Sequence, residues 1–264
     1  AGKSTTIRML LTLIRPGEGS ISLFGKPLEK NRAQILKNVG AIVEKPNFYA
    51  YLSAYKNLEI LSRISGKSIS SGRIMEILEL VGLKDRKDSK VKTYSHGMKQ
   101  RLGIAQSLLH NPDLIILDEP TTGLDPQGMK EIRDLIQRLR DEENKTIFLS
   151  SHILSEVEQV ANRMIILNKG KTIVEGNVQD LLDSAGLKVT FEVGEIDKAL
   201  KVINESRWKD KFDSANKTSI IFNLPSEEIA ELNKYLVGND ISVSAVIPTR
   251  SLEHYFLKIT EAAT

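Results

Sequence analysis

The sequence predicts an α/β fold followed by a second, smaller domain. Leu114–Leu117 is a fully apolar run of strand length, which is typical of a strand buried on both faces of a parallel sheet. Amphipathic helical patterns alternate with strand-like runs, and a new series of such patterns begins near residue 187. Two acids, Asp118 and Glu119, directly follow this run. They stand at the carboxyl end of the expected strand, where α/β sheets bind ligands, so they mark a candidate site.

The composition narrows the class of protein. The 264 residues suffice for one large core, or for a domain with a smaller companion. The 37 basic and 34 acidic residues are mixed along the chain, so the net charge of +3 gives little reason to expect a nucleic-acid partner. Absent cysteines exclude disulfides, and no run approaches the roughly 18 apolar residues of a membrane span. With no recognisable signal peptide, the sequence predicts a soluble, cytoplasmic chain.

The first residues form the second half of a phosphate-binding pattern, Gly-x-x-x-x-Gly-Lys-Ser/Thr. Gly2, Lys3 and Ser4 precede apolar positions at helical spacing. The full pattern needs further residues and a strand upstream, so we expect a chain truncated within this loop. In such a loop, backbone N–H groups cradle phosphates, Lys3 neutralises the β- and γ-phosphates and the Ser4 hydroxyl offers an oxygen to Mg²⁺.

A buried strand is expected to end at Glu44. This acid is either a ligand-binding group at the sheet edge or a solvated acid at a strand end. The tract 48–61 carries aromatic residues that could anchor a partner helix, although core packing explains most aromatic residues. Gly82 ends an apolar helical repeat and precedes a solvated basic cluster. The elements expected here are a strand at 20–24, a helix at 32–38, a strand at 39–43 and helical structure over 62–93.

Ser95 is expected to cap a helix that runs from Met98 to Leu109. Its hydroxyl and the N–H of Gly97 would form a ready anion site, because free backbone donors and the helix dipole both favour negative charge. The alternative is an ordinary cap, which is common in helices.

Two acids and a histidine are expected at the carboxyl ends of neighbouring strands. Alternation sends Asp118 and Glu119 to different sides, so one can serve a metal ion while the other polarises a water molecule. The alternative is that the strand ends at the protein surface with two solvated acids. His152 follows the expected strand 146–150; a lone histidine is usually structural, but a neutral imidazole can donate one hydrogen bond and accept another. The other expected elements are helices at 129–139 and 154–161 and strands at 163–167 and 171–175.

The segment Tyr94–Met98 resembles the signature motif of the ATP-binding-cassette (ABC) ATPases, Leu-Ser-Gly-Gly-Gln. Ser95 and Gly97 keep the serine and the second glycine of that motif. The other three positions, Tyr94, His96 and Met98, depart from it in a manner similar to exporter-type members.

Further motifs carry the same resemblance. Leu114–Glu119 is similar to Walker B with its catalytic glutamate, Gly123–Asp125 to the D-loop, and His152 to the switch histidine. Glu44 stands where the family usually has the glutamine of the Q-loop, a variant that resembles the ATPases of bacitracin and lantibiotic immunity transporters.

This resemblance implies a P-loop NTPase (RecA-like) core with a helical signature subdomain over residues 1–183, and binding of ATP and Mg²⁺. It implies that Glu119 and His152 are catalytic. Two ATPase subunits would clamp two ATP molecules head to tail, and a separate transmembrane permease would hold them at the inner face of the membrane. The implied nucleotide contacts are Gly2, Lys3, Ser4, Thr5, Glu44, Ser95, Gly97 and Asp125, and the implied metal ligands are Ser4, Glu44 and Asp118.

Residues 187–264 are expected to form a small α+β accessory domain. It has no catalytic constellation and resembles the tail of many exporter-type cassettes, so its role stays open. The expected elements are strands at 188–193, 219–223 and 241–246 and helices at 196–204, 227–236 and 252–259.

Two alternatives to a transport ATPase remain. Non-transport members of the family serve chromosomes and DNA repair, but they insert long coiled coils, and none lies between Thr5 and Ser95. Translation factors carry two cassettes in one chain, whereas one appears here. An inactive or regulatory fragment is the other alternative, which an ATPase assay with the upstream residues restored would test.

Overall fold

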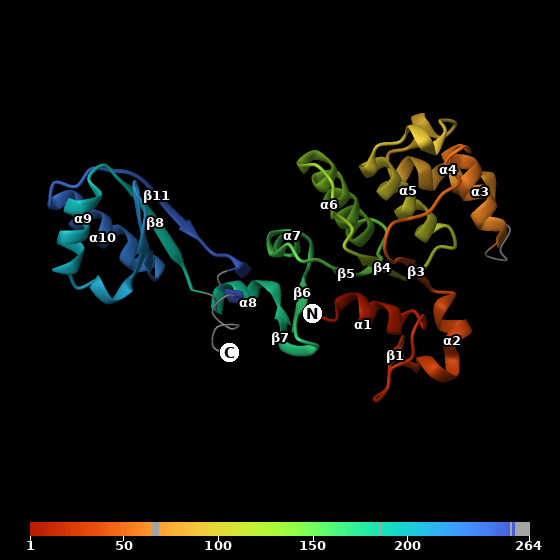
Figure 1. The fold of residues 1–264 in the computed structure, drawn as a ribbon, viewed down its shortest axis with the longest axis horizontal. Coiled ribbons are helices and arrows are strands. Elements are labelled where there is room, and N and C mark those ends of the chain that lie inside the picture. Colours follow the sequence, from red (N-terminus) through yellow and green to blue (C-terminus); the bar gives the residue numbers. More distant parts are fainter. Residues whose placement is uncertain (65–68, 185, 254, 257–264) are drawn as a thin grey trace. The chain divides into compact units, whose positions relative to one another are not determined.

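The computed structural model describes residues 1–64, 69–184, 186–253 and 255–256. The chain forms two compact units (Figure 1): Ala1–Val160 with Leu167–Thr172, and Ala161–Ile166 with Ile173–Thr264. The hairpin of β6 (Arg163–Asn168) and β7 (Lys171–Asn177) contributes residues to both. The domain boundary expected at 183–187 therefore stays a prediction.

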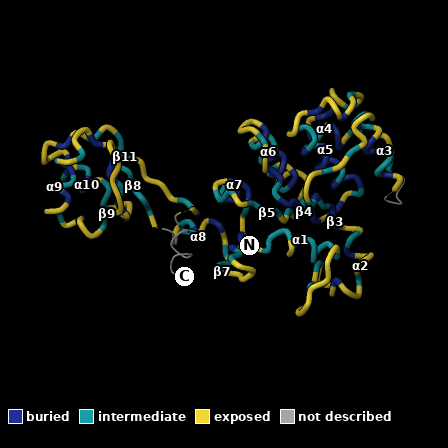
Figure 2. The backbone as a smooth tube through the Cα atoms, in the orientation of Figure 1, coloured by how far each residue is buried: buried dark blue, intermediate teal, exposed yellow. Residues whose placement is uncertain are grey.

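A three-stranded parallel sheet forms the centre of the first unit. Its strands β3 (Val39–Ile42), β4 (Leu114–Asp118) and β5 (Thr146–Ser150) lie in that order. Strand β4 is buried along its whole length, as its apolar run predicts (Figure 2). The register places Asp118 beside Ser150, so the carboxyl ends of β4 and β5 meet at one edge of the sheet.

Helix α1 (Lys3–Leu10) and helix α2 (Leu28–Leu36) pack around a core that includes Ile7, Ile35 and Ile116. The strand expected at 20–24 is reduced to β1 (Ser22–Leu23), which pairs with β2 (Lys26–Pro27). The helix expected at 32–38 begins four residues earlier, at Leu28.

The helical part contains α3 (Ala54–Ile64), α4 (Ser71–Leu80), two short 3₁₀ turns, η1 (Lys84–Arg86) and η2 (Val91–Thr93), and α5 (His96–Leu108). The prediction of helix over 62–93 was wrong after Leu80, because Gly82 turns the chain at φ 67° and only the two 3₁₀ turns follow. Residues 65–68 lie outside the described part.

Helix α5 lies unusually close to β3. A Cβ atom on Gly40 would stand 2.2 Å from the carbonyl oxygen of Ser107, so only glycine fits this crossing. Helix α6 (Pro126–Asp141) buries Ile132, Ile136 and Leu139 at helical spacing. The short helix α7 (Leu154–Val160) contacts α6.

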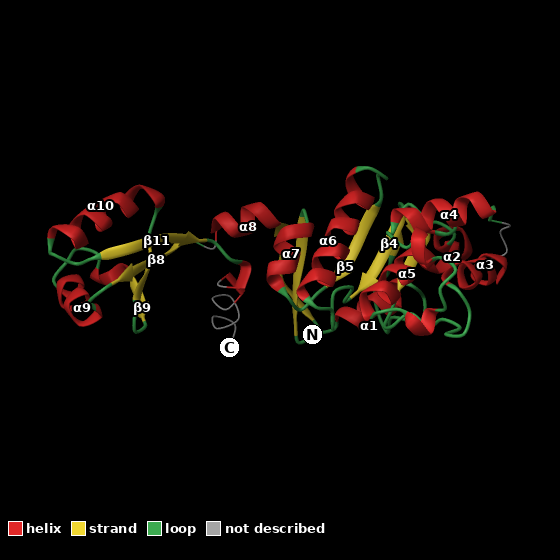
Figure 3. Ribbon diagram, turned by 90° about the horizontal axis from the view of Figure 1, so that it is seen from above, coloured by secondary structure: helices red, strands yellow, loops and turns green. Residues whose placement is uncertain are grey.

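The second unit contains an antiparallel sheet. Its strands are, in spatial order, β11 (Val243–Thr249), β8 (Lys188–Val193), β10 (Ser219–Asn223) and β9 (Phe212–Ala215), of which Figure 3 labels β11, β8 and β9. Its core includes Phe191 and Phe222. The sequence predicted neither α8 (Val178–Ser184) nor β9, and part of the helix expected at 252–259 lies outside the described residues. No helix in the described ranges is long and apolar enough to cross a membrane. The other elements of this unit are α9 (Ile196–Asn204), η3 (Lys209–Lys211) and α10 (Ser226–Gly238).

Candidate functional site

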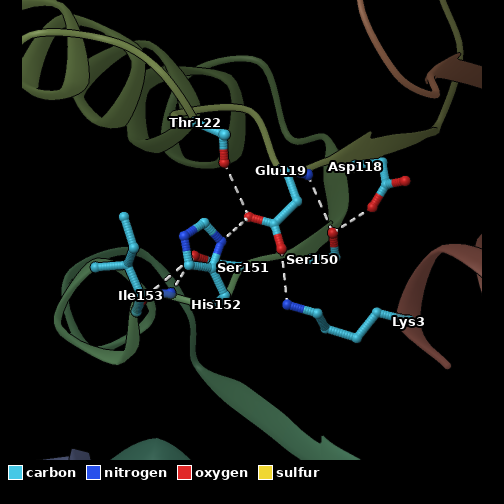
Figure 4. A network of polar contacts seen from close by, with 8 residues as sticks. All are labelled: Lys3, Asp118, Glu119, Thr122, Ser150, Ser151, His152 and Ile153. Carbon is cyan, nitrogen blue, oxygen red and sulfur yellow. Dashed lines mark hydrogen bonds and ion pairs between the residues drawn. The ribbon is translucent and has the colours of Figure 1, made fainter. Parts of the chain in front are cut away.

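Three distant segments meet at the carboxylate of Glu119, directly after β4 (Figure 4). The Lys3 ammonium donates to Oε1 at 2.7 Å, and Thr122 donates to Oε2 at 3.0 Å. The Nδ1 atom of His152 lies 2.6 Å from Oε2. An ionised carboxylate only accepts hydrogen bonds, so Nδ1 carries the proton and a neutral His152 keeps Nε2 as an acceptor.

The two neighbouring acids have different surroundings. Asp118 is buried and accepts a hydrogen bond from the Ser150 hydroxyl at 2.5 Å. The backbone N–H of Glu119 donates to the same hydroxyl oxygen at 3.0 Å. Glu119 has a φ of 50°, in the left-handed region, so the chain turns sharply after the strand. The two neighbouring carboxylates thus have different hydrogen-bond partners.

The surroundings of Glu119 change its acidity. Burial raises the pKa of its carboxyl group, but hydrogen bonds from Lys3 and His152, the charge of Lys3 and the Thr122 hydrogen bond together outweigh burial. The pKa of Glu119 therefore lies below its ordinary value, and the group is ionised at neutral pH. An ionised carboxylate can accept a proton from water.

Helix α1 begins at this network. Gly2 precedes it at φ 102°, a conformation that favours glycine, and its carbonyl accepts from the Thr6 N–H at 2.9 Å. Lys3, Ser4 and Thr5 thus form the first turn, which carries no acidic residue. The first backbone N–H groups of a helix have no partner within it, so this end favours an anion.

A second group of expected site residues lies at the N-termini of α5 and α6. The Ser95 hydroxyl accepts from the Met98 N–H at 3.2 Å, as an N-cap should, and Asp125 accepts from the Gly128 N–H at 2.8 Å. A Cβ atom on Gly97 would lie 3.9 Å from the Gly128 Cα, so the two helix ends are close neighbours. Among the described residues, no hydrogen bond or ion pair joins this pair of caps to Lys3.

Glu44 lies apart from both groups. Its carboxylate forms an ion pair with Arg8 of α1, and its side chain is 67% exposed. Like Glu119, it has a left-handed backbone, with a φ of 66°. Sequence reasoning missed Arg8. A signal was present, because Arg8 is an isolated basic residue in an otherwise apolar helical pattern, one and a half turns beyond Lys3.

Comparisons with known proteins identify the family of this chain. A family model described as ABC transporter matches residues 1–122. The ABC transporter ATP-binding protein YhcH of Bacillus subtilis is 43% identical over 98% of this chain and 84% of that protein. The bacitracin transport ATP-binding protein BcrA of Bacillus licheniformis is 44% identical over 100% of this chain and 86% of that protein. The dimeric ATP-binding cassette MJ0796, solved with ADP and Pi, shares 26% identity and a TM-score of 0.58 over 67% of this chain and 81% of its own.

The fold and the site define a P-loop ATPase cassette. The chain belongs to the ABC transporter family, as an ATP-binding subunit. Its reaction is ATP hydrolysis coupled to transport. The family, the fold class and the nucleotide expected from the sequence are thereby confirmed.

Proposed function

We propose that this subunit powers export of an antimicrobial peptide or antibiotic through a separate membrane permease, at the inner face of the membrane. The likeness to the bacitracin transport protein over the whole chain supports this class of cargo. The named relatives are ATP-binding proteins of transporters, which supports a permease as partner.

The observation that carries the catalytic proposal is the shared carboxylate of Glu119. Lys3 and Glu119 form an ion pair at 2.7 Å. Phosphate groups beside Lys3 would compete for its charge and free the carboxylate to orient an attacking water and accept its proton. The Nδ1–H of His152, which donates to this carboxylate, could then turn to donate to the γ-phosphate.

The residues present fit Mg²⁺ as a companion of ATP. The described residues hold no cluster of three His, Cys, Asp or Glu side chains that could bind a metal alone. Mg²⁺ is commonly bound through one or two protein oxygens together with substrate phosphates and water, and Ser4 and Asp118 offer such oxygens. When bound, it would offset phosphate charge. Glu44 is a further candidate ligand, but its carboxylate is paired with Arg8.

A second copy of the chain completes the proposed active unit. Ser95, Gly97 and Asp125 would face the nucleotide held by Gly2, Lys3, Ser4 and Thr5 of the partner cassette. The dimeric form of the related cassette supports this arrangement. Free backbone N–H groups at the α5 N-terminus suit the phosphate charge.

Glu119→Gln tests the proposal in the full-length protein with its permease. The amide keeps the size of the side chain but is a poor base, so ATP binding should persist while turnover falls about 100-fold or more. Exposed Glu143→Gln is the matched control and should leave turnover unchanged. Full turnover in Glu119→Gln would contradict the assigned role, whereas wild-type turnover no higher than that of Lys3→Ala would favour the inactive-fragment alternative.

A further inference from the structure

Polar contacts join helices α6 and α7 along one face. Arg133 forms an ion pair with Glu156 at 2.5 Å, and Gln137 donates to the carbonyl of Gln159 at 2.9 Å. Arg140 donates to the carbonyl of Val160 at 3.0 Å. The three donors stand three or four residues apart on α6, so they lie on the same side of that helix.

Glu156 is an unusual member of this contact. Its side chain is 6% exposed, and that of Arg133 is 21% exposed. Its second oxygen, Oε2, is buried and has no hydrogen-bond partner in the described part of the chain. A buried carboxylate with an unsatisfied oxygen is costly, and apolar residues of similar size often serve stability equally well. Stability alone therefore gives a weak reason for this pair.

The place of α7 decides where His152 lies. Helix α7 has seven residues, and so short a helix is not stable by itself, so tertiary contacts must fix it. His152 precedes α7 by two residues, joined to it through a turn in which the Ile153 N–H donates to the Ser151 hydroxyl at 3.0 Å. The His152 side chain is 60% exposed, so packing does not hold it in place.

We propose that Arg133 and Glu156 are positioning residues that hold His152 in hydrogen-bond distance of Glu119. Helix α6, which is stabilised by its buried apolar face, starts at the cap Asp125 and anchors α7 through this ion pair. The pair thereby joins the segment after Asp125 to the segment that carries His152. The inference rests on the catalytic role proposed for His152.

The test is a double-mutant cycle of Glu156→Gln and His152→Ala, assayed for ATPase activity in the full-length protein with its permease. Glu156→Gln removes the charge at nearly constant size, and small displacements of a reacting group lower turnover on the order of 10-fold to 100-fold. We expect that loss in kcat, with KM for ATP within about twofold, because Lys3 and the first turn of α1 would supply most of the ground-state binding of ATP. In the His152→Ala background, Glu156→Gln should add nothing. Glu142→Gln, in the exposed Arg138–Glu142 pair at the C-terminal end of α6, is the control and should behave as wild type.

The outcomes that differ from this expectation distinguish the role of His152 from the role of the ion pair. If His152→Ala retains turnover, the catalytic role of His152 fails. If His152→Ala loses turnover but Glu156→Gln does not, or if the two losses multiply, the positioning role is overturned. Relative to Glu156→Gln, the double variant Arg133→Met with Glu156→Leu should restore the melting temperature without restoring kcat. Full turnover in this double variant would show that the ion pair contributes only to packing.

Discussion

At the scale of single residues, two of the expected site residues are glutamates with left-handed backbone. Glu44 has a φ of 66° and Glu119 a φ of 50°, and each closely follows a parallel strand. This conformation costs about 1–2 kcal/mol per residue for side chains with a Cβ atom. It turns both carboxylates away from their strands, so that each finds a cation on α1, Arg8 or Lys3.

The lowered pKa of Glu119 predicts how stability changes with pH. The native state binds fewer protons at this group than the unfolded chain does, so the contribution is complete above the ordinary pKa of 4.5 and is lost as pH falls through the native value. The difference in unfolding free energy between wild type and Glu119→Gln should therefore shrink below pH 4.5. Urea titrations from pH 7 to pH 3 measure it, and a difference independent of pH would contradict the assigned ion pair.

Glu44 should contribute more to the coupling of ATP hydrolysis to the permease than to nucleotide binding. Glu44→Ala removes the partner of Arg8 and the candidate Mg²⁺ oxygen, so we expect permease-stimulated ATPase activity and resistance to fall several-fold while ATP affinity changes little. Glu44→Gln should be milder, because its carbonyl can still accept from Arg8. Affinity, ATPase rate and resistance are measured for both variants and for Arg8→Ala. Unchanged rate and resistance in Glu44→Ala would make Glu44 a solvated strand end.

At the scale of elements, β3 and α5 cross in close contact at Gly40. An added methyl group on Gly40 would overlap the Ser107 carbonyl, so Gly40→Ala should destabilise the protein by about 1–3 kcal/mol or more. Gly238→Ala, at the end of α10, meets no atom within 4 Å and is the control, with a slight stabilisation expected. Denaturant midpoints compare the two. A Gly40→Ala variant as stable as wild type would show that α5 shifts freely.

The elements that sequence reasoning located have strong local signals. The apolar run of β4 and the helical spacing of apolar residues in α6 reflect burial, and both patterns are visible in the sequence itself. Strand β9 was missed because three of its four residues are exposed, so it lacks the alternation of a half-buried strand. The end of the helical stretch after Leu80 was misplaced because two 3₁₀ turns replace a regular helix there.

The candidate site was predicted as a set of residues but not as a set of contacts. Motif spacing identified Lys3, Glu119 and His152, and the structure brings them together. The pairs Arg8–Glu44 and Arg133–Glu156 join residues 36 and 23 positions apart. Such pairs depend on how elements pack, which no local pattern records, so sequence reasoning could not supply them.

At the scale of the whole molecule, the two units have separate cores, and one side chain reports on the second. Trp208 is the single tryptophan, is buried, and donates its indole N–H to Glu228 at 3.0 Å. Its fluorescence should follow unfolding of the second unit, whereas circular dichroism follows both units. ATP with Mg²⁺ binds the first unit in our proposal, so it should shift the dichroism transition and leave the fluorescence transition in place. Coincident transitions that move together would show that the two units unfold as one.

The left-handed glutamates carry a consequence for how variants of this protein are chosen. Glycine adopts such a backbone without strain, so replacing Glu44 or Glu119 by glycine would relax the chain at each turn. The same replacement removes the carboxylate on which the proposed chemistry or coupling depends. At Glu44 the exposed pair with Arg8 contributes little stability, so a selection for heat resistance alone would enrich replacements there that fold well and fail to drive transport. Screens of this protein therefore need a transport readout beside the melting temperature.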